Sequence, residues 1–204
     1  MAKKAKVLKK GKPKTSASFQ EKTKVEKVLE EVWPLERDFF ERPDRYRYVR
    51  KLARPKTCVF CSAEKKRLSF DSLVLAKTQH AMVILNKYPY NSGHLLVLPR
   101  KHIGEIWELG EEELMEITKW TQSSMRILHE VYQCKGLNMG MNHGAVAGAG
   151  IPDHIHWHIV PRWLGDTNFF PLIAQTRALP ETLKQTYERL RPAFKEELKK
   201  WESK

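Results

Sequence analysis

The sequence has little of three things that would place it in other protein classes. No apolar run approaches the ~18 residues that a membrane-spanning helix needs. The first residues, MAKKAKVLKKGKPK, are basic, but no apolar stretch follows them, which argues against a secretory signal. Only 3 of the 204 residues are cysteine, too few for a disulfide framework. Because Cys58 and Cys61 form a close pair, they suit a metal site in a reducing cytoplasm better.

Acidic residues are also scarce, since 24 Asp and Glu accompany 37 Lys and Arg, for a net charge of +13. Residues 1–14 hold seven lysines and no acid, which leaves only +6 for residues 15–204. This composition predicts a basic disordered tail over residues 1–18. The tail would be a solvated arm or a weak contact for RNA or another polyanion.

The rest of the chain is long enough for one compact domain with extensions, and 41% apolar residues supply its core. Residues 19–57 predict a helix over Val25–Trp33 and then a charged connecting arm. Elsewhere the pattern predicts strands, a long helix at 111–134 and a final helix at about 180–201 that Pro192 interrupts or kinks. The expected strands are 73–78, 81–86, 94–99, 136–142 and a histidine-rich run. This order predicts an α+β fold with a mostly antiparallel sheet of about five strands.

The histidine-rich run is DHIHWHIVPR, with His154, His156 and His158 at alternate positions. Side chains alternate faces along a strand, so a strand would place the three imidazoles on one face and Ile155 and Ile159 on the other. Three uses are open: metal binding, attack of an imidazole on phosphorus, or structural histidines that each have a hydrogen-bond partner.

Two other features bear on that choice. A C-x2-C pair supplies half of a tetrahedral zinc site, with His102 and one of the three histidines as natural further ligands; otherwise the pair is two buried thiols in a turn. The run GAVAGAG directly before the histidines has the uncovered backbone N–H groups of an anion-binding loop, or is a flexible connection. His94 either approaches the same site from a neighbouring strand or packs in the core.

Taken together, these motifs resemble the histidine triad (HIT) superfamily of nucleotide hydrolases and transferases. HIHWHIVPR looks like the motif that names it, LNKYPYNSGHLLVLPRKHI like its strand–turn–strand, and NHGAVAGAG stands where its phosphate-contacting loop does. CVFC and PRWLGDTNFFPLI resemble the bacterial diadenosine polyphosphate phosphorylase-like branch, which is related to the galactose-1-phosphate uridylyltransferases. The resemblance spans about residues 55–165. We therefore expect a HIT domain at 58–170 and a C-terminal helical extension at 171–204.

The resemblance also implies roles for particular side chains. His156 would be the nucleophile that attacks the α-phosphorus, with His154 beside it, and His158 would orient it or hold the phosphate. His94 falls on an expected position of the strand–turn–strand motif and is a further candidate catalytic residue. The residues implied to bind nucleotide, at the ribose or the phosphates, are Asn86, Asn142, Gly148, Gly150 and His158. The residues implied to bind a structural zinc are Cys58, Cys61, His102 and His154.

The resemblance implies that the protein is a cytoplasmic homodimer. Its implied activity is that of a nucleotidyl phosphorylase or transferase that acts on dinucleoside polyphosphates such as diadenosine tetraphosphate. Inorganic phosphate or water would accept the nucleotide. Many HIT hydrolases have a glutamine four residues before the first triad histidine, and Gly150 stands there in this chain, which favours the phosphorylase-like branch. The alternatives are a hydrolase of dinucleoside polyphosphates or nucleoside phosphoramidates, a non-catalytic nucleotide- or RNA-binding protein, and a metallohydrolase in which all three histidines bind metal.

Overall fold

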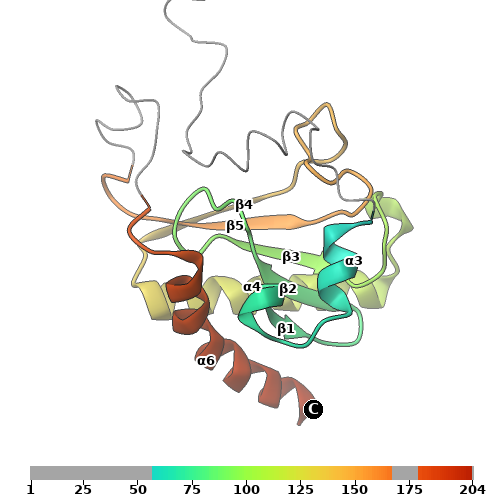
Figure 1. The fold of residues 1–204 in the computed structure, drawn as a ribbon. Helices are drawn as coiled ribbons and strands as arrows, with labels where there is room; N and C mark the ends of the chain where they lie inside the picture. Colours follow the sequence, from blue (N-terminus) through green and yellow to red (C-terminus); the bar gives the residue numbers. More distant parts are fainter. Residues whose placement is uncertain (1–56, 167–178, 204) are drawn as a thin grey trace, which may run out of the picture. The chain divides into compact units, whose positions relative to one another are not determined.

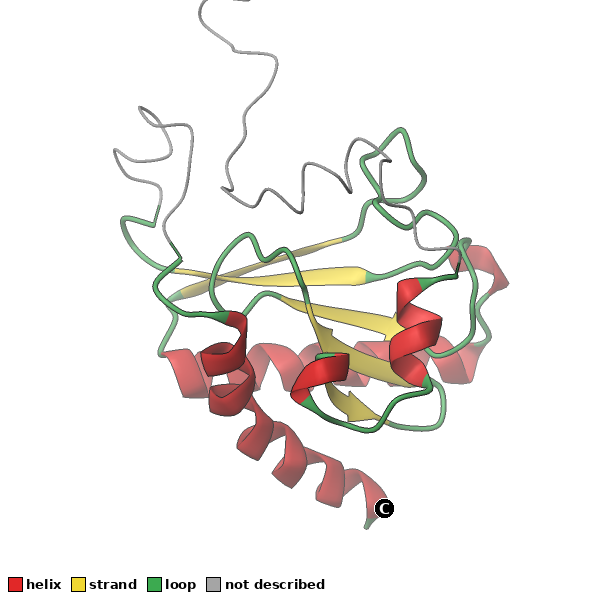
Figure 2. Cartoon of the chain, viewed as in Figure 1, coloured by secondary structure: helices red, strands yellow, loops and turns green. Residues whose placement is uncertain are grey.

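The computed structural model describes residues 57–166 and 179–203. Within these ranges one five-stranded antiparallel sheet has the strand order β1-β2-β3-β5-β4. Its strands are β1 (Val74–Lys77), β2 (Ala81–Leu85), β3 (Leu95–Pro99), β4 (Gly136–Gly140) and β5 (Trp157–Arg162). The helices are α3 (Val59–Glu64), α4 (Glu111–Tyr132) and α6 (Leu183–Glu202), with the short 3-10 helices η1 (Phe70–Ser72) and η2 (Ile106–Glu108). The predicted α+β fold is confirmed (Figure 2).

Each face of the sheet buries its own apolar set, because side chains alternate along a strand. Val83 and Val97 belong to the larger core, which also holds Trp120 of α4 and Phe194 of α6. The opposite face packs a smaller set against α3, and its buried members are Phe60, Ala63, Val74, Met82, Ile84, Leu96 and Leu98. Figure 1 shows α4 behind the sheet and α3 in front of it. The rings of His154 and His156 contact Phe60 of α3, so they lie on this side of the sheet.

The two long helices follow the sequence closely. Three glutamates begin α4 and complement its macrodipole, as the sequence predicts. α6 continues through Pro192, so the predicted interruption is wrong, and the alternative of a kink at Pro192 stays a prediction. The physical reason is burial: Leu190 and Phe194 are fully buried on either side of the proline, and their packing offsets the hydrogen bond that proline cannot make.

The histidine strand begins later than predicted, at Trp157, so His154 and His156 precede it. The backbone bonds of this segment go elsewhere, because the N–H of Ile155 donates to the carbonyl of Ile103 at 2.7 Å, outside the β3–β5 ladder. The predicted alternation persists nevertheless, since Ile155 and Ile159 both join the larger core.

Several predictions fall beyond the described residues. The tail at 1–18, the helix at Val25–Trp33 and the arm up to residue 56 lie outside them, and the domain boundaries stay predictions. In the described part of the chain, no helix combines the length and the apolar character needed to cross a bilayer.

Candidate active site and metal centre

A chain of hydrogen bonds fixes the protons of two facing imidazoles. The antiparallel pairing of β3 with β5 brings the fully buried His94 beside His158, with His94 Nε2 and His158 Nδ1 2.9 Å apart. The backbone N–H of Tyr90 donates to His94 Nδ1 at 3.0 Å, so a neutral His94 carries its proton on Nε2 and donates it to His158 Nδ1. His158 then carries its own proton on Nε2.

That Nε2 of His158 has no hydrogen-bond partner among the described residues, although it is shielded from solvent. A buried N–H without a protein acceptor is costly, so its presence indicates a place for an acceptor from outside the chain. An anionic oxygen, such as one on a phosphate, has the matching chemistry.

His156 has the opposite arrangement. Its Nδ1 lies 2.8 Å from the carbonyl oxygen of His154, which can only accept, so His156 carries its proton on Nδ1. The lone pair is left on Nε2. The ring is 7% exposed and packs edge-on against Phe60 at 5.1 Å and against His158 at 5.1 Å. The site therefore offers one imidazole lone pair beside one imidazole N–H donor.

Burial keeps these rings neutral. It lowers the pKa of His156, and it lowers the pKa of His158 to about 4, with a smaller contribution from the neighbouring His156. The cause is the loss of hydration, which penalises the charged imidazolium. A neutral imidazole is the form that can act as a nucleophile.

Two aromatic residues of the site were not predicted. The ring of Tyr90 stacks on His158 with 5.8 Å between centroids and 16° between planes, and Phe60 contacts His154 as well as His156. The signal was present, because Phe60 lies inside CVFC and Tyr90 inside YPYNSG. Asn86 is close by: its amide Nδ2 lies 3.3 Å from His94 Nδ1, and its Oδ1 accepts the N–H of Tyr88.

The glycine-rich segment lies on the loop between β4 and β5. Gly144 and Gly148 have φ of +79° and +89°, a backbone conformation that favours glycine. The N–H of Gly148 donates to the carbonyl of Ala145 at 3.1 Å, which makes the loop a compact turn. The contacts of Asn142, Gly148 and Gly150 with phosphate stay predictions.

Four side chains from three separate segments meet at the first histidine of the triad. The ligand atoms of this set all lie within 4.8 Å of one another. Its members are Cys58, Cys61, His102 and His154, which are the residues that the family resemblance implies. Of the three triad histidines, only His154 is in the set, so the structure does not bring all three to one metal.

The geometry and the protonation of this set fit a tetrahedral metal ion. The Nε2–H of His154 donates to the carbonyl of Pro99 at 2.9 Å, which leaves the Nδ1 lone pair facing the cysteines. Nδ1 of His154 lies 3.3 Å from Nδ1 of His102, 3.4 Å from Sγ of Cys58 and 3.6 Å from Sγ of Cys61. Tetrahedral zinc with bonds of about 2.0–2.3 Å needs ligand separations of about 3.3–3.8 Å.

Burial and neighbouring groups set the protonation of two of these residues, Cys61 and His154. Burial raises the pKa of the Cys61 thiol, and the neighbouring Cys58 raises it further. The pKa of His154 is lowered to about 4, mainly by burial and to a smaller extent by the nearby His102 and His156, while the hydrogen bond to Pro99 opposes the shift. Neutral His154 can ligate a metal through Nδ1, whereas the Cys61 thiol ionises when a cation is bound beside it.

Comparisons with known proteins agree with this geometry. The HIT domain family model matches residues 67–163. An uncharacterized HIT-like protein of Methanocaldococcus jannaschii is 32% identical over 109 residues, which are 53% of this chain and 81% of that protein. The chain belongs to the HIT family.

Within this family, the HIT protein described here is similar to an AP-4-A phosphorylase of Mycobacterium tuberculosis. The two are 38% identical over 116 residues, which are 57% of this chain and 60% of the relative. The chain thus spans less than two thirds of the length of that relative. A zinc-bound histidine triad family protein of Mycobacterium smegmatis has the same fold, with a TM-score of 0.55 and 26% identity over 69% of this chain and 94% of that one. The HIT family predicted from the motifs is confirmed, and the similarity to the AP-4-A phosphorylase agrees with the predicted resemblance to that branch.

Proposed function

We propose that this HIT protein is a nucleotidyl phosphorylase that acts on dinucleoside polyphosphates such as diadenosine tetraphosphate. The proposal rests above all on one observation: His156 holds its proton on Nδ1 and keeps the Nε2 lone pair beside the unpartnered Nε2–H of His158. The similarity to the mycobacterial AP-4-A phosphorylase supports the substrate class.

The proposed reaction has two displacements. In the first, Nε2 of His156 attacks the α-phosphorus, a P–N bond forms, and the bond from that phosphorus to the bridging oxygen breaks to release ATP. In the second, an oxygen of inorganic phosphate attacks the same phosphorus, the P–N bond breaks, and ADP leaves with the imidazole neutral again. The Nε2–H of His158 would donate to a nonbridging oxygen in both steps.

The hydrogen bond to the His154 carbonyl assists the first displacement. When His156 becomes a nucleotidyl imidazolium, its Nδ1–H carries part of the positive charge, and the carbonyl oxygen stabilises that charge. His94 is a positioning residue in this scheme, because it directs the proton of His158 to Nε2.

We also propose that Cys58, Cys61, His102 and His154 bind one structural zinc ion. The zinc-bound relative supports the identity of the metal. Zinc with four protein ligands supplies rigidity and no open position for water, so it would hold α3, the segment after β3 and the start of the histidine run together. Metal analysis of the purified protein should find one zinc per chain.

The test is incubation with diadenosine tetraphosphate, with and without inorganic phosphate, followed by chromatography of the products. We expect ADP and ATP only when phosphate is present, and loss of turnover in His156→Asn. His80→Asn is the matched control, since the His80 imidazole lies on the turn between β1 and β2 and pairs with Glu112 of α4, and it should keep full activity. AMP and ATP without phosphate would make the protein a hydrolase, and absence of turnover would contradict the substrate class.

A dimer is part of the same proposal. The family resemblance implies a homodimer, and sedimentation equilibrium should give twice the chain mass. A monomer with full phosphorylase activity would remove the dimer from the proposal and leave the reaction intact.

A further inference from the structure

Helix α3 carries the cysteine ligands but is too short to be stable alone. It has six residues, with Cys58 as its N-cap and Cys61 inside it. Phe60 and Ala63 bury the side of α3 that faces the sheet. Apolar contacts of this kind do not by themselves fix the rotation and tilt of a single helical turn, so the polar contacts at its other end become important.

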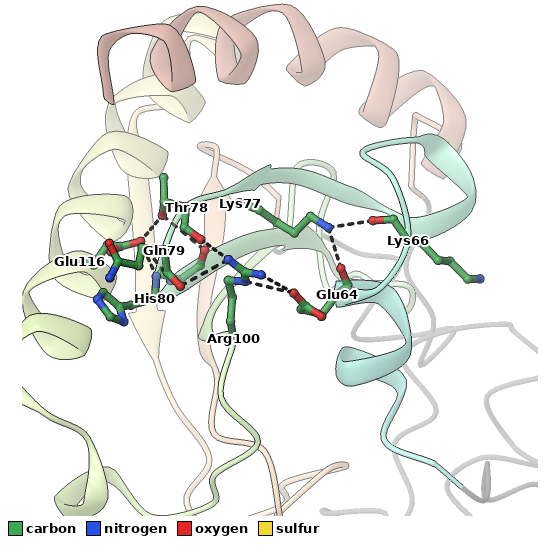
Figure 3. Close-up of polar contacts among 9 residues, drawn as sticks. Glu64, Lys66, Lys77, Thr78, Gln79, His80, Arg100 and Glu116 are labelled. Carbon is green, nitrogen blue, oxygen red and sulfur yellow. Dashed lines mark hydrogen bonds and ion pairs between the residues drawn. The ribbon is translucent and has the colours of Figure 1, made fainter. Parts of the chain in front are cut away.

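Two cations from the sheet hold the C-terminal end of α3 (Figure 3). Lys77 at the end of β1 donates through Nζ to the carbonyls of Glu64 and Lys66 at 2.6 and 2.7 Å. The Glu64 carbonyl lies at the negative end of the helix dipole, where a carbonyl has no partner within a short helix, and Lys66 follows just beyond the helix. Lys77 thus supplies the cap that the sequence of α3 itself does not.

Arg100 makes the second attachment, from the residue directly after β3. Its Nε and one terminal nitrogen donate to Oε1 of Glu64 at 3.1 and 2.6 Å. The other terminal nitrogen donates to the carbonyl of Thr78 at 2.8 Å and, more weakly, to that of Gln79 at 3.4 Å. The guanidinium lowers the pKa of the Glu64 carboxyl, so the pair is charged at neutral pH. One planar side chain therefore joins the end of α3 to the β1–β2 turn.

Arg100 lies in a short segment, Pro99 to His102, that is linked to all four proposed metal ligands. The preceding residue, Pro99, accepts the Nε2–H of His154 through its carbonyl. Two residues after Arg100, His102 supplies a ligand of its own. The segment from Pro99 to His102 thus touches every part of the four-residue set: it orients His154, it holds the cysteine helix, and it carries His102.

We propose that Arg100, assisted by Lys77, is a positioning residue for the metal centre. It holds α3 against the end of β3, so that Cys58 and Cys61 face the two histidines before the metal binds. This inference rests on the proposed zinc site. A preorganised set of ligands loses less conformational entropy on binding than a mobile one, so loosening α3 should weaken zinc binding.

The direct test is the zinc dissociation constant, measured by competition with a chromophoric chelator. We expect about 10-fold weaker zinc binding or more in Arg100→Met. Arg67→Met is the matched control, because Arg67 is an exposed arginine just beyond α3 whose loss removes the same charge, and it should leave the affinity unchanged. Zinc affinity in Arg100→Met within two-fold of the wild type would overturn the proposal.

A second set of variants ties the effect to the contact. Arg100→Lys can reach Glu64 but cannot bond the turn carbonyls at the same time, so it should recover only part of the affinity. Glu64→Met should weaken binding as well, and the double variant Glu64→Met/Arg100→Met should lose less than the sum of the single losses. If the losses of zinc affinity were additive, Arg100 and Glu64 would act separately, and the proposed role of their contact would be overturned.

Hydrogen exchange in the zinc-free protein separates positioning from unfolding. The Arg100 and Glu64 side chains are 38% and 22% exposed, so we expect the sheet of Arg100→Met to stay folded while exchange rises in residues 58–66. Unchanged exchange there would contradict the proposal. Should Arg100→Met not fold, Glu64→Gln and Lys77→Met allow the same two measurements. A wild-type protein that binds no zinc would refute the zinc site itself, a result distinct from tight zinc binding that Arg100 does not affect.

Discussion

Glu116 of α4 is a buried carboxylate that completes the turn between β1 and β2, and its replacement makes a sharp stability test. Its Oε1 accepts the backbone N–H groups of His80 and Ala81 at 3.0 and 3.1 Å, and also the hydroxyl of Thr78 (Figure 3). The Glu116 residue is 9% exposed and Ala81 is fully buried. Glu116→Ala removes one acceptor from three donors at once.

The magnitude follows from those donors. A buried donor left without a partner costs about 1–3 kcal/mol. The N–H of Ala81 carries this cost fully, the partly buried N–H of His80 carries less of it, and the Thr78 hydroxyl has the carbonyl of Ala81 within 3.4 Å as another acceptor. We therefore expect Glu116→Ala to lower the free energy of unfolding by about 3 kcal/mol. Glu116→Gln keeps a carbonyl oxygen for the same donors and should cost about 1 kcal/mol.

Urea denaturation at saturating zinc measures both variants. With a urea m value of about 2 kcal/mol/M, the Glu116→Ala midpoint should fall by about 1.5 M, and the Glu116→Gln midpoint by about 0.5 M. Glu111→Ala is the control, because Glu111 is an exposed glutamate on the same helix. A Glu116→Ala midpoint within 0.3 M of the wild type (about 0.6 kcal/mol at that slope) would refute the role of the acceptor. Equal losses in both variants would show that the negative charge, rather than the acceptor, stabilises the turn.

Three further predictions follow from the site and its surroundings. Gly93 has φ +77°, and a Cβ there would lie 2.9 Å from Tyr132, so Gly93→Ala should cost about 2 kcal/mol or more in thermal unfolding. Since the pKa of His158 is about 4 when folded and about 6.5 when unfolded, the unfolded chain binds more protons between these pH values. The His158 ring should therefore lower stability as the pH falls from 6.5 to 4, by at most about 3 kcal/mol for this one ring because it is partly solvated, and His154 acts in the same direction. Cys58→Ser should lower the zinc content well below that of the wild type.

Each of these has an outcome that contradicts it. An unchanged melting temperature in Gly93→Ala would mean that the turn can shift to admit a methyl group. His158→Asn should flatten the fall of stability between pH 6.5 and 4, and an equally steep fall in that variant would assign the effect to other groups. Full zinc occupancy in Cys58→Ser would place the metal elsewhere.

The face alternation of the histidine run and the long helix could be predicted from the sequence, because both depend on residues that are neighbours along the chain. The alternation in DHIHWHIVPR correctly predicted that Ile155 and Ile159 leave the histidine face for the larger core. The acidic start and the apolar spacing correctly predicted the long helix α4. The predicted interruption at Pro192 was wrong, because a rule for the isolated helix omits the burial of the residues around the proline.

The sequence by itself thus determined the fold class, the family and the residue types available for chemistry, since periodicity and motif order are properties of consecutive residues. The tertiary structure decided which of these meet, and in which protonation state. His102 and His154 are far apart in the chain, yet their Nδ1 atoms lie 3.3 Å apart. The proton positions on His156 and His158 depend on a backbone carbonyl and on a partner from another strand. The contact of Arg100 with Glu64 depends on how α3 lies on the sheet, and no pattern of consecutive residues encodes that packing.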